Sequence, residues 1–480
     1  MEDMFDLIIQ LSENPNPWVL FSLASQILAL LHIPSILLRR RNPIGQLAWI
    51  MSLFIFPFFG VMGWWIFGRT RIDKKKAIHV KKRSAFSRHS DPSSDENVQA
   101  QYQFATTQGN DVQTLLSGQE AYKAILSAIA NARHHIHLEF YIWKDDTVGN
   151  TFLHALVDAK KRGVEVRIIV DAVGSSEVTG SFFKPLKAVG AQVGIFLPFR
   201  LFRRSLRLNF RNHRKIVIID GCLGFTGGLN IGDEYNQWYD TFFQIVGPMV
   251  SQLQEVFCED WYFVSSTELK ESAYLTPAEC SVDLLTDSKS SYTLPPASDL
   301  RGRIIASGPD RDIEMIHSVF FIAITQATER IYITTPYFIP DQAILAALRT
   351  AVMRGVDVRL LLPGKSDVRI AQWASRAYFE ELICAGVQIF EYQKEILHAK
   401  MMVIDDRFTI IGSANMDIRS FRLQFEINMA MDSVEQNGTL GELFLEKLSH
   451  SIEIDGPLLE THSTLRKLGE AAARLFSPLL

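Results

Sequence analysis

Two long apolar runs lie within the first 70 residues. Trp18–Leu38 and Ile44–Phe67 contain no Asp, Glu, Lys or Arg, and each has the length of roughly 20 residues that crosses the hydrocarbon core of a bilayer. Tryptophans stand near the run ends, where indole rings favour the membrane interface. The pattern predicts two helices over 1–70 that are transmembrane or re-entrant. A cleaved signal peptide is disfavoured because the leading segment is acidic and lacks a basic region.

Beyond residue 105, the alternation of apolar and polar positions predicts the same strand–helix–strand unit twice. Arg162–Val170 (RGVEVRIIV) and Arg354–Leu362 (RGVDVRLLL) match in pattern, and each follows a helical stretch. A strand pattern containing a tyrosine precedes each helix, at Ile136–Trp143 and Ile331–Ile339. Repeated units of this kind predict an α/β fold.

The period of the repeat, near 190 residues, is too long for a solenoid and indicates duplication of a whole domain. We expect domains at 106–285 and 300–480, paired about a pseudo-twofold axis. A basic and polar linker is expected over 71–105, between the membrane helices and the first domain.

Charge is distributed unevenly along the chain. The net charge of −4 combines −4 for residues 1–38, +10 for 39–83 and −10 for 84–480. Arg39–Arg41 separate the apolar runs, and eight Lys or Arg follow the second run. The larger cluster favours a cytoplasmic body, and a re-entrant hairpin with both clusters on one side fits the same charges. Such a flank would lie against anionic headgroups.

The strongest chemical signal is a motif that occurs once in each half with identical spacing. The first copy is His213-x-Lys215-x4-Asp220, with the tail Gly227-Gly228-x-Asn230. The second is His398-x-Lys400-x4-Asp405, with the tail Gly412-Ser413-x-Asn415. Two copies with such similar tails are very unlikely to arise by chance.

The local pattern predicts how these side chains point. Residues two apart in a strand share a face, so His213 and Lys215 should project together, as should their second-half counterparts. Four potential cations with several polar donors, and without an acidic ligand cluster, suit a phosphate group. We therefore expect no metal and no cofactor. The phosphate-binding residues besides the lysines would be Asn230, Asn415 and Ser413.

Each histidine also needs a carboxylate to orient it. Asp240 lies ten residues after Asn230, and Glu426 lies eleven after Asn415. We interpret this matched pair as the partners of the two histidines. Asp220 and Asp405 are expected to brace the turn and the lysines, which is a structural role.

The double motif resembles the signature of the phospholipase D superfamily, and the chain is more narrowly similar to the bacterial cardiolipin synthases of that superfamily. The resemblance covers nearly the whole chain. Besides the apolar runs, it includes Arg211–Lys215, Gly227–Tyr235, Thr335–Asp341 and Gly412–Ser420.

This resemblance implies two phospholipase D-like α/β/α domains and a multi-pass protein of the bacterial inner membrane. It implies transfer of a phosphatidyl group between two phosphatidylglycerol molecules through a phosphohistidine, with release of glycerol. By the resemblance, His213 is the nucleophile and His398 the acid and base, although the near-symmetric motifs alone leave their order open. The two lysines and the two asparagines would stabilise charge on the phosphoryl oxygens.

Three other interpretations are considered. A hydrolase would use water as acceptor, and an inactive membrane scaffold would keep a phosphate-binding pocket. The third is nucleic-acid binding, since Phe196–Lys215 holds seven Lys or Arg interleaved with aromatics. The apolar runs favour a lipid partner, phosphatidylglycerol in an anionic bilayer, over nucleic acid. No oligomeric state is predicted.

An apolar stripe also marks the C-terminal stretch. Leu465, Leu468, Ala472, Leu475 and Phe476 share one helical face. Packing into the protein core is favoured for this stripe, with an interfacial helix as the alternative.

Overall fold

The computed structural model describes residues 17–38, 43–68, 103–178, 180–198, 209–269, 274, 300–311, 314–457, 463–475 and 477. The Arg39–Arg41 cluster, most of the predicted linker and the charged segment 199–208 lie outside the described residues. The chain forms two compact units. The smaller unit holds helices α2, α3 and α4, and the larger holds all the described strands.

Helix α2 (Pro17–Leu37) is the one helix in the described ranges that is long and apolar enough to cross a bilayer, with 21 residues and a mean hydropathy of 1.8. Its polar side chains are satisfied within the helix. The Ser25 hydroxyl donates to the Ser22 carbonyl, and the Ser35 hydroxyl donates to the His32 carbonyl. Such local bonds make short polar residues tolerable at membrane depth.

The second apolar run does not form one helix. It is divided into α3 (Pro43–Ile55) and α4 (Pro57–Phe67). Pro57 disfavours helical geometry at the residue before it, and Phe56 leaves the helix at φ −133° and ψ 74°. At 1.5 Å per residue, α3 is only about 20 Å long, short of the ~30 Å hydrocarbon core. Of the two alternatives for Ile44–Phe67, a transmembrane or a re-entrant segment, the described residues show no second helix of spanning length.

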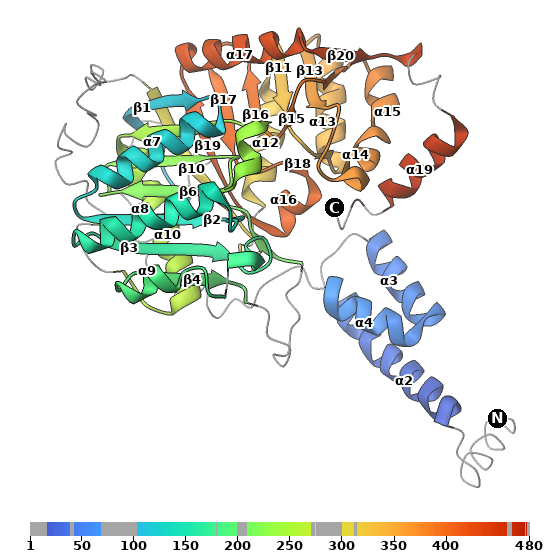
Figure 1. The fold of residues 1–480 in the computed structure, drawn as a ribbon. Coiled ribbons are helices and arrows are strands. Elements are labelled where there is room, and N and C mark those ends of the chain that lie inside the picture. Colours follow the sequence, from blue (N-terminus) through green and yellow to red (C-terminus); the bar gives the residue numbers. More distant parts are fainter. Residues whose placement is uncertain are drawn as a thin grey trace, which may run out of the picture. The chain divides into compact units, whose positions relative to one another are not determined.

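Helices α3 and α4 pack on α2 as a hairpin (Figure 1). The Gln46 amide, near the start of α3, donates to the Ile36 carbonyl at 3.1 Å. The Trp64 indole, near the end of α4, donates to the Ser35 hydroxyl at 3.2 Å. At the other end, the Phe58 ring lies 5.4 Å from the Phe21 ring. Both ends of the hairpin thus meet the C-terminal end of α2, and its turn lies near the N-terminal end.

The first half of the larger unit alternates strands and helices. Its elements are β1 (Thr107–Leu115), α7 (Gly118–Asn131), β2 (His135–Phe140), α8 (Thr147–Lys161), β3 (Glu165–Asp171), η2 (Ser176–Val178), α9 (Lys184–Ala188), β4 (Gln192–Phe196), β5 (Arg211–Asn212), β6 (Ile216–Ile219), β7 (Leu223–Gly227), η3 (Asp233–Gln237), β8 (Trp238–Tyr239), β9 (Phe242–Val246) and α10 (Pro248–Ser265).

The second half follows a similar order. Its elements are β10 (Leu300–Ser307), α12 (Met315–Gln326), β11 (Arg330–Thr334), β12 (Phe338–Ile339), α13 (Gln342–Met353), β13 (Asp357–Pro363), α14 (Arg369–Arg376), α15 (Phe379–Cys384), β14 (Gln388–Tyr392), β15 (Ile396–Leu397), β16 (Met401–Ile404), β17 (Phe408–Gly412), β18 (Met416–Asp417), α16 (Ile418–Arg422), β19 (Gln424–Asp432), α17 (Val434–Leu448), β20 (Ser451–Ile454) and α19 (Thr464–Arg474).

The predicted strand–helix–strand units are confirmed. In the first, β2 pairs with β3 in parallel across α8, with Ile136 opposite Val166. In the second, β11 pairs with β13 in parallel across α13, with Ile331 opposite Val358. Every residue of β2 is buried, as expected for central strands of an α/β sheet covered on both faces.

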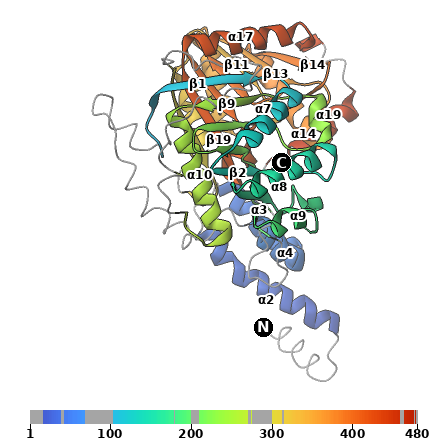
Figure 2. The same cartoon turned by 60° about the vertical axis from the view of Figure 1, so that its left-hand side comes forward.

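One large sheet runs through both halves, with the strand order β4-β3-β2-β6-β7-β9-β1 in the first half. The second half continues in reverse as β10-β19-β17-β16-β11-β13-β14-β20. The halves meet where β1 and β10 pair in antiparallel fashion, with Thr107 opposite Gly302. Helix α10 crosses this sheet and contacts strands of both halves, including β4 and β10 (Figure 2).

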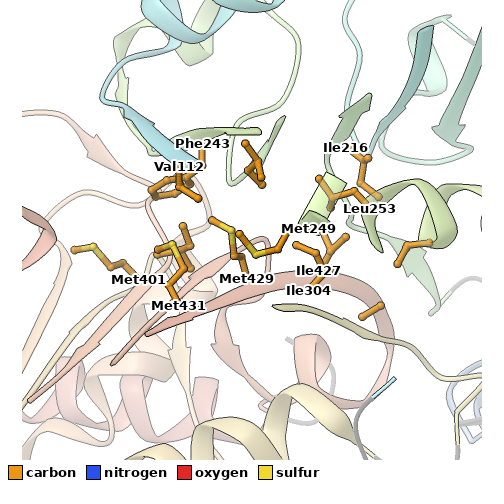
Figure 3. Close-up of a cluster of buried hydrophobic side chains, with 14 of the residues drawn as sticks. Val112, Ile216, Phe243, Met249, Leu253, Ile304, Met401, Ile427, Met429 and Met431 are labelled. Carbon is orange, nitrogen blue, oxygen red and sulfur yellow. The ribbon is translucent and has the colours of Figure 1, made fainter. Parts of the chain in front are cut away.

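A hydrophobic cluster joins the two halves of the larger unit. Met249 and Leu253 of α10 are fully buried beside Met429 and Met431 of β19, with Phe243 of β9 in the same cluster (Figure 3). Unbranched methionine side chains adapt to irregular gaps between layers. This shared core keeps the two motif-bearing strands at a defined separation.

Candidate active site

The first histidine motif lies where a short strand of one half meets the other half. Strand β5 pairs in parallel with the start of β19, with Asn212 opposite Phe425. The backbone N–H of His213 then donates to the Phe425 carbonyl at 2.9 Å. His213 is therefore held directly beside the strand that carries Glu426.

The second motif has the same environment with the halves exchanged. Strand β15 pairs in parallel with β8, with Leu397 opposite Tyr239. The backbone N–H of His398 donates to the Tyr239 carbonyl at 2.8 Å. His398 thus lies beside the chain segment that carries Asp240.

Each imidazole contacts the acid of the opposite half. Nδ1 of His213 lies 3.1 Å from the Glu426 carboxylate, and Nδ1 of His398 lies 2.6 Å from the Asp240 carboxylate. A carboxylate at Nδ1 fixes the ring orientation and leaves Nε2 for chemistry. Neither Nε2 atom has a hydrogen-bond partner among the described residues.

The residue between His213 and Lys215 points the other way and anchors the motif. The Arg214 guanidinium forms a buried ion pair with Asp260. It also donates to the Ser307 carbonyl at 3.0 Å and to the Glu426 carbonyl at 3.2 Å. This alternation confirms the predicted shared side of His213 and Lys215, and the arginine ties the loop to the second half.

Burial sets the protonation of the histidines. It lowers the pKa of His213 to about 4, outweighing Glu426, which raises it; Lys215 and Lys400 lower the pKa further. Burial likewise lowers the pKa of His398, and Lys400 adds to the effect. Both imidazoles are therefore neutral near pH 7 in the ligand-free pocket, which suits a nitrogen nucleophile.

The two lysines are buried in the same pocket. The Lys215 ammonium donates to the His213 carbonyl at 2.7 Å, and the Lys400 ammonium donates to the His398 carbonyl. An ammonium has three N–H donors, so each lysine keeps donors for a ligand. Burial lowers the pKa of Lys215 to about 7 and that of Lys400 to about 8. An anion entering between them would raise both values.

Aromatic rings border both histidines. The Tyr141 ring lies 4.9 Å from that of His213, with the Lys215 ammonium 5.6 Å from its centroid. The Trp238 ring lies 5.2 Å from that of His398. Tyr141 is the tyrosine of the predicted strand at Ile136–Trp143, whereas no motif marked Trp238. Its position two residues before Asp240 on a short strand was the available signal, since residues two apart share a face.

Ser413 does not face the pocket as a phosphate donor. It is fully buried, and its hydroxyl donates to the Glu426 carboxylate and accepts the Ile427 N–H at 2.9 Å. The expectation that it binds substrate phosphate is wrong, because the acid of its own half already uses the hydroxyl. In the first copy the Asp240 carboxylate fills the space beside Gly228, because a Cβ there would lie 2.1 Å from Asp240 Oδ1.

The two motif asparagines lie in the buried site region. Asn230 accepts the Ile142 N–H at 3.1 Å through its side-chain oxygen, which leaves its amide nitrogen as a donor. The Asn415 backbone N–H donates to the Ser420 hydroxyl at 3.1 Å, and its side chain lies beside Asp417. Local bonds therefore hold both asparagines in place.

Asp220 and Asp405 lie away from the histidines and do not brace the lysines. The Asp220 carboxylate accepts the backbone N–H groups of Arg133, His134 and His135 at the start of β2. Asp405 does the same at the start of β11. Each aspartate follows a four-residue strand whose other end adjoins the lysine, a separation of about 15 Å at strand spacing. Their role in the turn is as expected, but the expected contact with the lysines is wrong.

No group of three or more His, Cys, Asp or Glu side chains that could hold a metal ion occurs within the described part of the chain. The lysine and asparagine side chains of the site can instead bind an anion, with the two imidazoles at the centre.

Comparisons with known proteins agree with this geometry. The family described as "Cardiolipin synthase, PLD-like domain" matches residues 125–261 and 320–448. The family described as "Phospholipase_D-nuclease N-terminal" matches residues 26–69. The first match covers one histidine motif in each of its two segments.

Curated relatives match along nearly the full length. A cardiolipin synthase of Geobacillus thermodenitrificans is 37% identical over 92% of this chain and 90% of its own length. Cardiolipin synthase 2 of Bacillus cereus is 37% identical over 93% of this chain and 88% of its own length. Among solved structures, phosphatidylserine synthase of Haemophilus influenzae covers 77% of this chain and 95% of its own, with a TM-score of 0.56 and 16% identity. At that identity the likeness shows the fold alone.

Proposed function

We propose, since this chain belongs to the family of cardiolipin synthases with phospholipase D-like domains, that it joins two phosphatidylglycerol molecules into cardiolipin and releases glycerol. The observation that carries this function is the crossed pair of imidazoles. Each is held at Nδ1 by a carboxylate of the opposite half, with two buried lysines beside them.

In the first step, Nε2 of His213 attacks the phosphorus of one phosphatidylglycerol. The P–N bond forms as the bond from phosphorus to the glycerol oxygen breaks, and the leaving oxygen takes a proton from His398. The order of the two histidines follows the family resemblance. Asp240 orients His398 and favours its protonated form, and an entering phosphate anion favours that form further.

In the second step, a hydroxyl of the second phosphatidylglycerol attacks the phosphohistidine. It gives its proton to His398 as the O–P bond forms, and the P–N bond breaks to regenerate neutral His213. The ammonium groups of Lys215 and Lys400, with the amides of Asn230 and Asn415, stabilise the charge on the phosphoryl oxygens in both steps. A preorganised, water-excluded site strengthens these interactions.

The two halves act as two domains, at 106–285 and 300–480, related by a pseudo-twofold axis near the β1–β10 pair. The reversed strand order on either side of that pair supports this arrangement. So does the exchange of histidines and acids between halves. Duplication would explain why one site needs both copies of the motif.

The smaller unit is a single membrane span with a re-entrant hairpin. In this arrangement α2 crosses the bilayer, and α3 and α4 enter and leave on the side where α2 ends. Contacts at both ends of the hairpin support it. Both basic clusters then flank the same side in sequence, which the positive-inside rule assigns to the cytoplasm of a bacterial inner membrane.

The function is tested with the purified full chain in phosphatidylglycerol micelles, by separating the lipid products. Cardiolipin and glycerol in equal amounts are expected, and phosphatidic acid as the main product would instead mean hydrolysis. His213→Ala and His398→Ala should each abolish product while the thermal unfolding transition stays unchanged. Near-normal turnover in either folded variant would refute the mechanism.

A further inference from the structure

Helix α19 has an apolar stripe that stays exposed on the larger unit. Leu465, Leu468 and Leu475 are 82%, 66% and 80% exposed. They lie on one helical face, while Ala473 on another face is buried in the second-half core. The expectation that the stripe packs into the core is therefore wrong. Three solvent-exposed leucines on one face of a helix indicate a surface that another apolar phase covers.

Helix α14 extends this stripe. Val368, Ile370 and Trp373 are 38%, 41% and 49% exposed. The Trp373 ring lies against α19, 3.5 Å from where a Cβ on Gly469 would stand, so the two helices pack closely. We define the α14/α19 face as Val368, Ile370, Trp373, Leu465, Leu468 and Leu475.

Basic residues accompany this apolar face. Lys467 lies beside the leucine stripe on α19, and Arg369 begins α14. Arg474 of α19 instead stacks on the Tyr378 ring at 4.4 Å and pairs with Glu381. The acidic Glu470 of α19 is buried and paired with Arg466. An amphipathic helix with exposed Leu, a neighbouring Trp and flanking Lys and Arg has the chemistry of a helix lying in the surface of an anionic bilayer.

The face also borders the catalytic pocket. Asp367, the residue before Val368, accepts the Tyr337 hydroxyl at 2.7 Å. Its carboxylate acts electrostatically on both His398 and Lys400. A bilayer in contact with the α14/α19 face would therefore lie close to the second histidine motif.

We propose that the α14/α19 face docks the catalytic body on an anionic bilayer, with the leucines and Trp373 among the lipids and the basic side chains at the phosphates. A lipid bilayer is the partner of this face because its anionic headgroups suit the basic side chains and its acyl chains suit the apolar ones. In the membrane arrangement proposed above, α2 also keeps the chain at a bilayer. The docking face goes beyond the proposed function, which needs a lipid substrate but does not say which surface meets the membrane.

The direct test uses the full chain in vesicles of phosphatidylglycerol and phosphatidylcholine. The photoreactive residue p-benzoyl-phenylalanine replaces Leu468 in one protein and Met353 in a matched control, since Met353 is 84% exposed at the end of α13. After irradiation, mass spectrometry should find lipid adducts at position 468 and only background at position 353. Adducts with a second copy or with another segment of the chain would overturn the proposal, as would equal lipid adducts at both positions.

A second arm measures the consequence for turnover. Leu465→Ser, Leu468→Ser and Leu475→Ser are combined, and rates are compared on phosphatidylglycerol vesicles and on monomeric short-chain phosphatidylglycerol. The ratio of vesicle rate to monomer rate should fall roughly tenfold or more, given the apolar area lost, whereas Met353→Ser should keep the wild-type ratio. An unchanged ratio in the triple variant would overturn the proposal. The adducts need no turnover, so they should persist with His398→Ala, which separates this proposal from the catalytic one.

Discussion

Nδ1 of His398 lies 2.6 Å from the carboxylate of Asp240, although the two residues are 158 positions apart and belong to different halves. His213 and Glu426 form the reciprocal contact. Neither half can therefore complete a histidine–carboxylate pair alone, and the site exists only when the halves are docked through β1, β10 and their shared core.

Asp240→Asn should lower kcat by about 10²- to 10⁴-fold, the usual contribution of a general acid and base. The amide cannot stabilise the imidazolium form of His398. Asp240 also raises the pKa of Lys400, so the variant is compared at a pH low enough to keep both lysines charged and lipid binding intact. Steady-state kinetics with phosphatidylglycerol should show kcat falling and KM nearly unchanged. A raised KM with normal kcat would mean that Asp240 binds substrate instead.

Gly228→Ala and Ser413→Ala should differ sharply in effect. A Cβ at Gly228 would lie 2.1 Å from Asp240 Oδ1, so Asp240 must move and His398 loses its orientation. Ser413→Ala removes the hydrogen bonds of the hydroxyl to Glu426 and from the Ile427 N–H without displacing either group, which costs about 1–3 kcal/mol, or roughly 5- to 150-fold in rate. We expect Gly228→Ala to be the less active variant in cardiolipin formation. The reverse order would contradict the assigned role of the glycine.

The pH dependence of kcat/KM should reflect the lysines and both histidines. His398 must be protonated to act as the acid, and burial lowers its pKa, so its deprotonation adds to the decline on the alkaline side. The ammonium forms of Lys215 and Lys400 are lost as pH rises through their pKa values of about 7 and about 8, so phosphate binding weakens and kcat/KM declines. On the acid side, His213 must be neutral to attack, so kcat/KM falls as pH drops through its pKa of about 4. Bound phosphate raises the lysine pKa values, so kcat should decline at higher pH than kcat/KM. A kcat/KM that is still rising at pH 10 would rule out this assignment.

Asp220→Ala should destabilise the fold and leave the chemistry of the folded enzyme nearly unchanged. The variant leaves three backbone N–H groups at the start of β2 without their acceptor, a loss of about 2–4 kcal/mol in the free energy of unfolding. Asp220→Asn is the control, because it keeps an acceptor oxygen and tolerates the φ of +54° at this position. Denaturant unfolding gives the stability. A large loss of kcat with unchanged stability would instead place Asp220 in catalysis.

The membrane arrangement predicts that the two flanks of the smaller unit lie on opposite sides. An epitope tag placed ahead of Pro17 should be digested by protease added to intact spheroplasts. A tag inserted after Gly68 should stay protected until the cells are lysed, because α3 and α4 return to the side where α2 ends. Two complete spans would leave both tags on the same side.

Local patterns were sufficient for the elements and for the partners of the two histidines. Apolar periodicity predicted β2–α8–β3 and β11–α13–β13. Strands that are buried on both faces are recognisable because their sequences are nearly continuous apolar runs. The identical spacing of the two His-Lys motifs predicted a shared phosphate site. The matched positions of Asp240 and Glu426 marked them as partners of the histidines.

The sequence by itself thus determined which residues belong to the candidate site, whereas the tertiary structure decided which of them meet. That His213 takes Glu426, and that the Ser413 hydroxyl is used up by the same acid, depends on how strands of two halves align. The exposure of Leu468 also depends on how neighbouring elements pack, whereas the break at Pro57 follows from the proline itself. A periodic apolar stripe predicts that one face of a helix is covered by other apolar groups. Only the packing of neighbouring elements decides whether protein or lipid covers that face.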